Sequence, residues 1–234
     1  MLISLHLPKT AGTRFRSLLA THFGERLLAD YADAPLHDTI AARRLRALRA
    51  GTGLLLQPGR LRDVDAVHGH FLAIKYSLWG GGPGWRRVTW LRDPVERLAS
   101  HYHYWRRSYD PAQSGALHRR MLEEDWSLER FCLGPELRNS YRQFLWGVPL
   151  GRFDFVGITE HFDDDIDAFA RRILGIGSVC AAAADGAAAN INPAAPALYV
   201  EDASLRARIE QHHAADMALY RAACARRQRR MSHG

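Results

Sequence analysis

The chain has 234 residues, of which 47% are hydrophobic and 24% charged, a balance that is ordinary for a globular protein with a substantial core. Lys and Arg number 32 against 25 Asp and Glu, so the net charge is +7, and the isoelectric point is near 9.7. This basic balance favours an anionic ligand. The three cysteines, Cys132, Cys180 and Cys224, are spaced too widely for a disulfide framework or a zinc site.

The cysteine usage favours a reducing compartment. No apolar run is long enough to cross a membrane, and the first predicted strand begins at residue 2, which leaves no room for a signal peptide. We therefore expect a cytoplasmic protein with no membrane span.

Four short apolar segments predict buried strands, and helical sequence follows each of them. They cover residues 2–7, 64–71, 86–91 and 153–159. Residues 12–23 carry apolar side chains at helical spacing. Asp93 is the predicted N-cap of the helix behind the third strand, with Pro94 at its first position. An amphipathic helix is predicted behind the fourth strand. This alternation predicts an α/β fold with a central, mostly parallel sheet flanked by helices.

The remaining segments predict helices and loops around that sheet. Residues 38–50 predict a basic amphipathic helix, and residues 111–147 predict helical sequence with a break at Leu-Gly-Pro-Glu. Residues 181–190 are rich in alanine and predict a mobile loop, and one final helix is predicted over 202–229. We interpret residues 1–234 as a single domain.

The stretch HLPKTAGTRF joins the first predicted strand to its helix. Such a turn offers free backbone N–H groups to an anion. Small Ala11 and Gly12 permit close approach, Thr10 and Thr13 offer hydroxyl donors, and Lys9 adds a positive charge. Because the nucleotide P-loop pattern GxxxxGK[ST] is not matched, the stretch predicts an anion cradle of another kind.

A second motif, LRDPVERLASHY, follows the third predicted strand. Arg92 ends that strand and Ser100 comes eight residues later, about two helical turns on. The two side chains can therefore share a face, where a guanidinium and a hydroxyl suit a phosphate. Arg97 is predicted to be a surface charge of this helix, paired with a nearby acid.

Together the two motifs resemble the carbohydrate-type sulfotransferases that use 3′-phosphoadenosine 5′-phosphosulfate (PAPS), of the heparan-sulfate 2-O-sulfotransferase-like type. The stretches FVGITEHFDDDIDAF, INPAAP and DMALYRAA extend the resemblance over nearly the whole chain. The resemblance implies a P-loop-like three-layer fold, no required metal, and an acceptor-facing helical lobe within about 106–150. It also implies that the first motif holds the 5′-phosphosulfate and the second holds the 3′-phosphate, through Lys9, Thr10, Ala11, Gly12, Thr13, Arg92 and Ser100. Lys9 would in addition stabilise charge on the bridging oxygen as the bond breaks.

The stretch VHGHF supplies a candidate general base at the end of the second predicted strand. His68 and His70 lie on one face of the strand, so the pattern alone leaves both open. The resemblance favours His70 as the base that takes the proton of the acceptor hydroxyl. His101 and His103 are interpreted as surface or packing residues.

The stretch LRNSYRQFLWG has two interpretations. Asn139 and Arg142 are candidates for contact with the acceptor or the cofactor. Alternatively, the stretch is an amphipathic helix that buries Tyr141, Phe144 and Leu145.

The sequence therefore predicts a bacterial enzyme that transfers sulfate from PAPS to a carbohydrate or glycoconjugate hydroxyl, without nucleic acid. Two alternatives stay open. A small-molecule or nucleotide kinase of related fold would need Mg²⁺ and lacks the GK[ST] signature. A nucleic-acid-binding module would explain the charge, but no recognition motif is present. The acceptor and the oligomeric state are not predicted.

Overall fold

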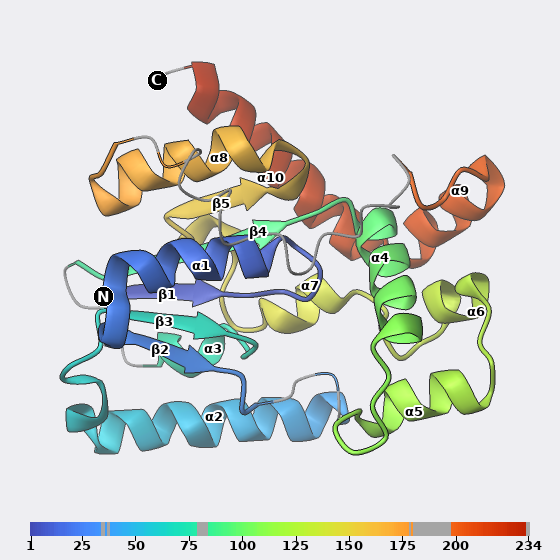
Figure 1. The fold of residues 1–234 in the computed structure, drawn as a ribbon, viewed down its shortest axis with the longest axis horizontal. Coiled ribbons are helices and arrows are strands. Elements are labelled where there is room, and N and C mark those ends of the chain that lie inside the picture. The colour runs from blue at the N-terminus through green and yellow to red at the C-terminus, as the bar shows by residue number, and fades with distance from the viewer. Residues whose placement is uncertain (34–35, 37, 79–83, 178, 180–197, 233–234) are drawn as a thin grey trace.

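The computed structural model describes residues 1–33, 36, 38–78, 84–177, 179 and 198–232. A single 5-stranded sheet has the order β2-β3-β1-β4-β5, and every pair of neighbouring strands is parallel. The strands are β1 (Leu2–Leu5), β2 (Leu27–Asp30), β3 (Ala66–Gly69), β4 (Arg86–Leu91) and β5 (Phe155–Ile158). Helices flank this sheet in a three-layer α/β arrangement, which confirms the predicted fold class (Figure 1).

Helices join the strands and also form a group beyond their carboxyl ends. They are α1 (Gly12–Phe23), α2 (Ile40–Leu56), α3 (Ile74–Ser77), α4 (Pro94–Arg107), α5 (Ala116–Glu123), α6 (Leu128–Leu133), α7 (Ser140–Phe144), α8 (Phe162–Phe169), α9 (Ala203–His212) and α10 (Ala214–Ser232). Short 3-10 turns cover Gly24–Arg26, Pro58–Leu61, Leu150–Arg152 and Thr159–His161, and a π turn covers Ala170–Leu174. Figure 1 shows α4, α5, α6 and α9 on the side to which the strand arrows point.

Three groups of buried side chains hold these layers together. In β1, Ile3 and Leu5 pack into one core, while Leu2 packs into the other together with Phe15 of α1. This alternation follows from the two-residue period of a strand, because successive side chains face opposite sides of the sheet. A third core joins α4, α5, α6 and α9 around buried aromatic side chains such as Trp105 and Phe131. The helical group therefore has its own hydrophobic support.

Two elements differ from their predictions. The sequence missed β2, an edge strand with exposed Leu28 and Ala29, because it lacks the apolar run of a buried strand. The predicted last helix is wrong as one element, since the chain bends at His213 between α9 and α10. There the His213 ring is buried, with Nε2 2.7 Å from the Cys132 carbonyl oxygen and Nδ1 3.2 Å from the Asn139 nitrogen. These contacts fix the bend.

The predicted loop at 181–190 and the stretch INPAAP at 191–196 lie outside the described residues. Within the described part of the chain, no helix has both the length and the apolar character needed to cross a membrane. The predicted helix at 38–50 is present and continues to Leu56.

Candidate functional site

The strand order brings the two sequence motifs together. β1 lies at the centre of the sheet between β3 and β4, with Leu5 in register with Gly69 on one side and Thr89 on the other. The HLPKTAGT loop, His70 and Arg92 each follow one of these three strands. Ligands of parallel α/β sheets bind beyond the carboxyl ends of the strands, where the order of connection reverses. Residues far apart in the sequence thus share one edge.

The backbone of the first loop is strained. Lys9 and Ala11 have φ values of 67° and 60°, in the left-handed region that residues other than glycine rarely adopt. Each such residue costs on the order of 1–3 kcal/mol, and such strain collects at ligand sites. Turns that alternate left-handed residues with others aim successive N–H groups into one concavity that suits an anion. The loop geometry is therefore that of an anion cradle at the start of α1.

The other residues of this loop differ in what they can offer an anion. The Thr10 hydroxyl is fully buried and donates to the Leu7 carbonyl oxygen at 2.8 Å. Thr13 is exposed at the start of α1. A Cβ on Gly12 would lie 1.7 Å from Nε2 of His6, so glycine is needed here to accommodate the His6 ring. Thr10 and Gly12 thus maintain the shape of the loop.

Replacing Gly12 with alanine is expected to destabilise the protein by about 1–3 kcal/mol, because the His6 ring must move to make room for the new methyl group. Urea denaturation measures this loss. Gly53→Ala is the matched control, since a Cβ at this position in α2 meets nothing within 4 Å. Alanine there is expected to be neutral or to stabilise the helix. Equal stability of the Gly12→Ala variant and the parent would contradict the assigned contact.

Two other positively charged side chains lie near Lys9. Its Nζ is 4.0 Å from the centroid of the Tyr104 ring. Burial, together with the nearby guanidinium groups of Arg107 and Arg92, lowers the pKa of Lys9 to about 8. None of these three cations forms an ion pair with an acid in the described part of the chain. Positive charges that lie near one another without an acid repel each other, which raises the free energy of the folded protein. A bound anion would reduce this repulsion.

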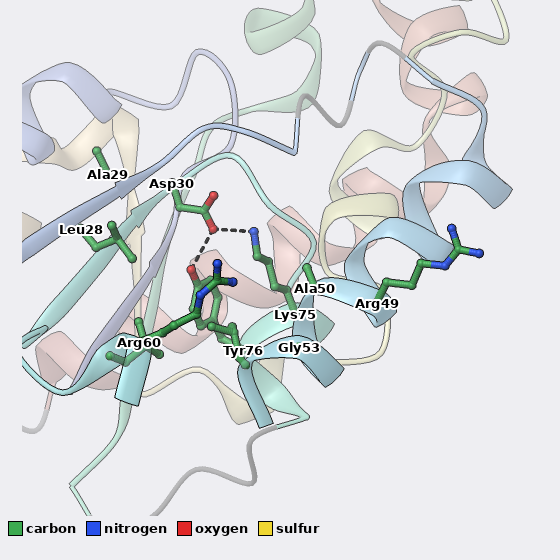
Figure 2. A pocket seen from close by; sticks show the side chains of 11 residues that line it. Leu28, Ala29, Asp30, Arg49, Ala50, Gly53, Arg60, Lys75 and Tyr76 are labelled. Carbon is green, nitrogen blue, oxygen red and sulfur yellow. Dashed lines mark hydrogen bonds and ion pairs between the residues drawn. The ribbon is translucent and has the colours of Figure 1, made fainter. Parts of the chain in front are cut away.

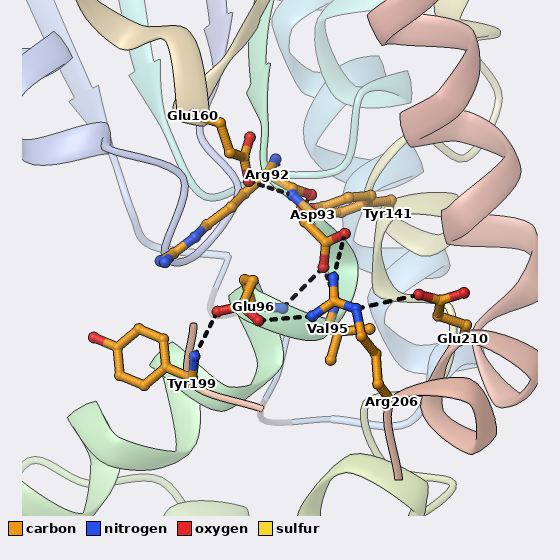
Figure 3. A network of polar contacts seen from close by, with 9 residues as sticks. All are labelled: Arg92, Asp93, Val95, Glu96, Tyr141, Glu160, Tyr199, Arg206 and Glu210. Atoms are coloured by element: carbon orange, nitrogen blue, oxygen red, sulfur yellow. Dashed lines mark hydrogen bonds and ion pairs between the residues drawn. The ribbon is translucent and has the colours of Figure 1, made fainter. Parts of the chain in front are cut away.

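The main chain of Arg92 is fixed by a tyrosine. The Tyr141 hydroxyl donates to the Arg92 carbonyl oxygen at 2.7 Å and accepts from the Arg92 N–H at 3.1 Å. Figure 3 shows the Arg92 side chain extending away from the polar network around it, and its guanidinium carbon is 5.7 Å from the Tyr199 ring centroid. A fixed backbone thus presents a guanidinium that is available to a ligand.

Replacing Tyr141 with phenylalanine is expected to cost about 1–3 kcal/mol of stability, because the partly buried Arg92 carbonyl loses its donor. It should also weaken the binding of anions that contact Arg92. Thermal denaturation and ligand titration measure the two effects. Tyr109→Phe is the control, since the Tyr109 hydroxyl makes no hydrogen bond to any described residue. If the two variants were equally stable, the Tyr141 hydroxyl would not anchor Arg92.

The start of α4 is held by a network of charges (Figure 3). Asp93 accepts from the N–H groups of Val95 and Glu96, which confirms its role as N-cap. Arg206 of α9 lies 3.0 Å from Asp93 Oδ2 and 2.8 Å from Glu96 Oε1. Glu160, behind β5, accepts from the Asp93 N–H at 2.8 Å. The acids at this helix start are therefore occupied in positioning α4 and do not neutralise the Arg92 guanidinium.

One face of α4 is directed toward the loop. Ser100, Tyr104 and Arg107 recur at intervals of four and three residues, which places them on one side of the helix. Tyr104 contacts Lys9, so this side of α4 faces the HLPKTAGT loop. The Ser100 hydroxyl forms no hydrogen bond among the described residues.

The predicted surface role of Arg97 is wrong. Its side chain is 1% exposed, and its guanidinium carbon lies 5.4 Å from the Tyr141 ring centroid. Within the described residues it forms no ion pair. Arg97 faces the interior because α7 packs its buried Tyr141 against this side of α4.

The two candidate bases have different environments. His68 is 1% exposed with Nδ1 2.7 Å from the Ser4 hydroxyl, and burial lowers its pKa to about 3. His70 is partly exposed, and its Nδ1 donates to the His6 carbonyl oxygen at 2.6 Å. A carbonyl only accepts, so the neutral His70 ring carries its lone pair on Nε2. Burial lowers the pKa of His70 against the opposing effect of this hydrogen bond, so the ring is neutral near pH 7.

Sequence reasoning missed two neighbours of His70. The His6 ring lies 4.3 Å from the His70 ring, and Tyr31 lies 4.9 Å from it, both measured between centroids. His6 Nδ1 is 3.1 Å from the Tyr31 hydroxyl. His6 stood within the quoted loop and could have been found, whereas Tyr31 follows the unpredicted strand β2.

The stretch around α7 shows the burial that the second interpretation predicts. Tyr141, Phe144 and Leu145 are buried, Arg142 is exposed, and Asn139 Oδ1 accepts from the Asp216 N–H at 3.3 Å. His101 is a packing residue, with its ring 4.4 Å from Trp105 and 5.7 Å from Phe131. His103 stacks on Tyr199 at 5.3 Å.

No family model matches this chain, and no curated protein matches it at a significant level. Among the described residues, no group of three or more His, Cys, Asp or Glu side chains is arranged to hold a metal ion.

Proposed function

We propose that this protein is a PAPS-dependent sulfotransferase that acts on a hydroxyl of a carbohydrate or glycoconjugate. The proposal rests on three cations, Lys9, Arg92 and Arg107, which form no ion pair with any described residue and lie beside a strained loop at the carboxyl ends of β1 and β4. The two motifs in this order, roughly 80 residues apart, also resemble the sulfotransferase family.

The residues present fit a ligand with two anionic ends. The N–H groups of the loop and Lys9 would hold the 5′-phosphosulfate. Arg92 and Ser100 would hold the 3′-phosphate, since both have polar groups without a partner among the described residues. When bound, PAPS supplies an activated sulfuryl group.

Side chains of the protein would accept the proton of the acceptor hydroxyl and stabilise the negative charge of the leaving group. His70 Nε2 would take the proton of the acceptor hydroxyl while the acceptor oxygen bonds to sulfur. The bond from sulfur to the bridging phosphate oxygen breaks, and adenosine 3′,5′-bisphosphate leaves. Lys9 would stabilise the negative charge on the departing oxygen. The tautomer of His70 suits this role, because the His6 carbonyl occupies Nδ1 and leaves Nε2 as the acceptor.

An assay of transfer tests the proposal. The purified protein is incubated with PAPS and a set of uncharged and acidic glycans in the presence of a chelator, and the release of adenosine 3′,5′-bisphosphate is measured. We expect acceptor-dependent release that the chelator does not change and that Lys9→Ala lowers by about 10²–10³-fold. Activity that requires Mg²⁺ and uses ATP as the donor would contradict the proposal and favour a kinase.

A further inference from the structure

Helix α2 carries an apolar stripe on its outer side. Of the nine large hydrophobic residues that are exposed in the described part of the chain, five lie on this helix. Leu45, Leu48 and Leu55 are 48%, 37% and 42% exposed, and their spacing of three and seven residues places them on one face. Leu56, at the end of the helix, is 77% exposed and Ile40, at its start, is 46% exposed. We call Leu45, Leu48, Leu55 and Leu56 the α2 stripe.

Another side of α2 is fixed to the protein. Ala47, Gly51 and Leu54 are buried there. A Cβ on Gly51 would lie 2.6 Å from the carbonyl oxygen of Lys75, so the helix backbone sits directly on α3. In Figure 1, α2 runs along the lower edge of the molecule over its whole length, with no described element below it. The α2 stripe is therefore held outward by the fold.

Helix α2 itself carries charge of one sign, and its only arginine with an ion pair among the described residues is Arg46, which pairs with Asp38 just before the helix. The helix contains Arg43, Arg44, Arg46 and Arg49 and no acidic residue. Arg44 lies over the Trp146 ring at 4.7 Å, and neither Arg44 nor Arg49 forms an ion pair with a described acid. The surface thus combines exposed leucines with unneutralised guanidinium groups.

A pocket of about 450 Å³ beside α2 is also lined by positively charged residues (Figure 2). The Lys75 Nζ at this pocket lies 2.8 Å from Asp30 and 2.9 Å from Asp33, so the charge of Lys75 is neutralised within the protein. Arg49 and Arg60 line the same pocket, and Arg60 also has no ion pair among the described residues. Positive charge is therefore left at the border of the pocket.

We propose that α2 docks the protein on an anionic lipid bilayer, with the leucines in the boundary between headgroups and acyl chains. A helix with an apolar face and arginines beside it is the pattern of interfacial membrane binding, in which guanidinium groups reach the lipid phosphates. A second copy of the chain fits this surface less well, because two α2 helices would bring arginines together with no acid on the helix to pair with them. The proposal is independent of the proposed function.

Flotation with lipid vesicles tests the docking. The full chain is mixed with vesicles of phosphatidylcholine alone, or of phosphatidylcholine and phosphatidylglycerol in equal parts, at low and at high salt. We expect flotation with the anionic vesicles, little with the neutral ones, and weakening as salt screens the arginines. The combined variant Leu45→Ser, Leu48→Ser, Leu55→Ser should reduce partitioning by about tenfold or more.

Two further variants complete the design. Leu198→Ser is the matched control, since Leu198 is 49% exposed but lies away from α2, and it should float like the parent. Arg44→Gln with Arg49→Gln should remove the preference for anionic vesicles. Far-ultraviolet circular dichroism verifies that every variant is folded. Absence of flotation, equal flotation with neutral vesicles, or unchanged flotation of the serine variant would overturn the proposal. So would self-association that the serine variant abolishes, because α2 would then bind a second copy.

Discussion

Replacing His70 with asparagine is expected to lower kcat for sulfate transfer by about 10²–10⁴-fold, the usual contribution of a general base. The amide of asparagine can still donate toward the His6 carbonyl, so the loop conformation should be retained. Binding of adenosine 3′,5′-bisphosphate should therefore be unchanged. Steady-state kinetics and a ligand titration on the same preparation separate the two quantities.

The control for this variant is His22→Asn, at an exposed position near the end of α1, which should retain full activity. His68→Asn is informative in another way. Because His68 is buried and bonded to Ser4, its replacement should lower stability more than kcat. If His70→Asn kept full activity, the base would have to be another group, and the assignment of His70 would be wrong.

Replacing Lys9 with alanine is expected to lower kcat by about 10²–10³-fold, by analogy with the removal of one preorganised donor from an acyl-transfer enzyme.

Lys9 is also expected to limit the activity at alkaline pH. Burial, with the charges of Arg107 and Arg92, lowers the Lys9 pKa to about 8, so the free protein loses this charge as the pH rises through that value. We expect kcat/KM to fall above about pH 8.

The acid side of the profile is expected to depend on His70. Because burial lowers the pKa of His70, the ring stays neutral to a pH below its ordinary value of about 6.5, and activity should fall only below that value. Lys9→Arg keeps its charge at high pH. In this variant the alkaline fall should disappear, whatever the absolute rate. An alkaline limb that persists in Lys9→Arg would show that another group titrates there.

Much of the sheet could be predicted from the sequence, because its central strands are buried on both faces and appear as apolar runs. β2 could not, since it is an edge strand whose place depends on backbone pairing with β3. The bend at His213 likewise depends on contacts with Cys132 and Asn139, which lie far away in the sequence. A sequence pattern within one segment does not predict contacts with residues that are distant in the sequence.

The candidate site likewise contains residues that the sequence predicts and contacts that it does not. Lys9 and Arg92 were found because each stands at the end of a predicted strand, and the strand order brings those ends together. The link from Tyr141 to Arg92 and the burial of Arg97 depend on the packing of α7 against α4. The contact with the His6 ring adds a second requirement for glycine at position 12, which the sequence pattern does not show.

If the cations at the sheet edge hold the two anionic ends of the sulfate donor, the protein must bind adenosine 3′,5′-bisphosphate without a metal. Calorimetric titration with this nucleotide, in the presence of a chelator, measures that binding. Arg92→Ala is compared with Arg62→Ala, a control at an exposed arginine outside the site. We expect metal-free binding that Arg92→Ala weakens sharply and Arg62→Ala leaves unchanged. Absence of binding, a requirement for Mg²⁺, or equal affinity for ATP would contradict it.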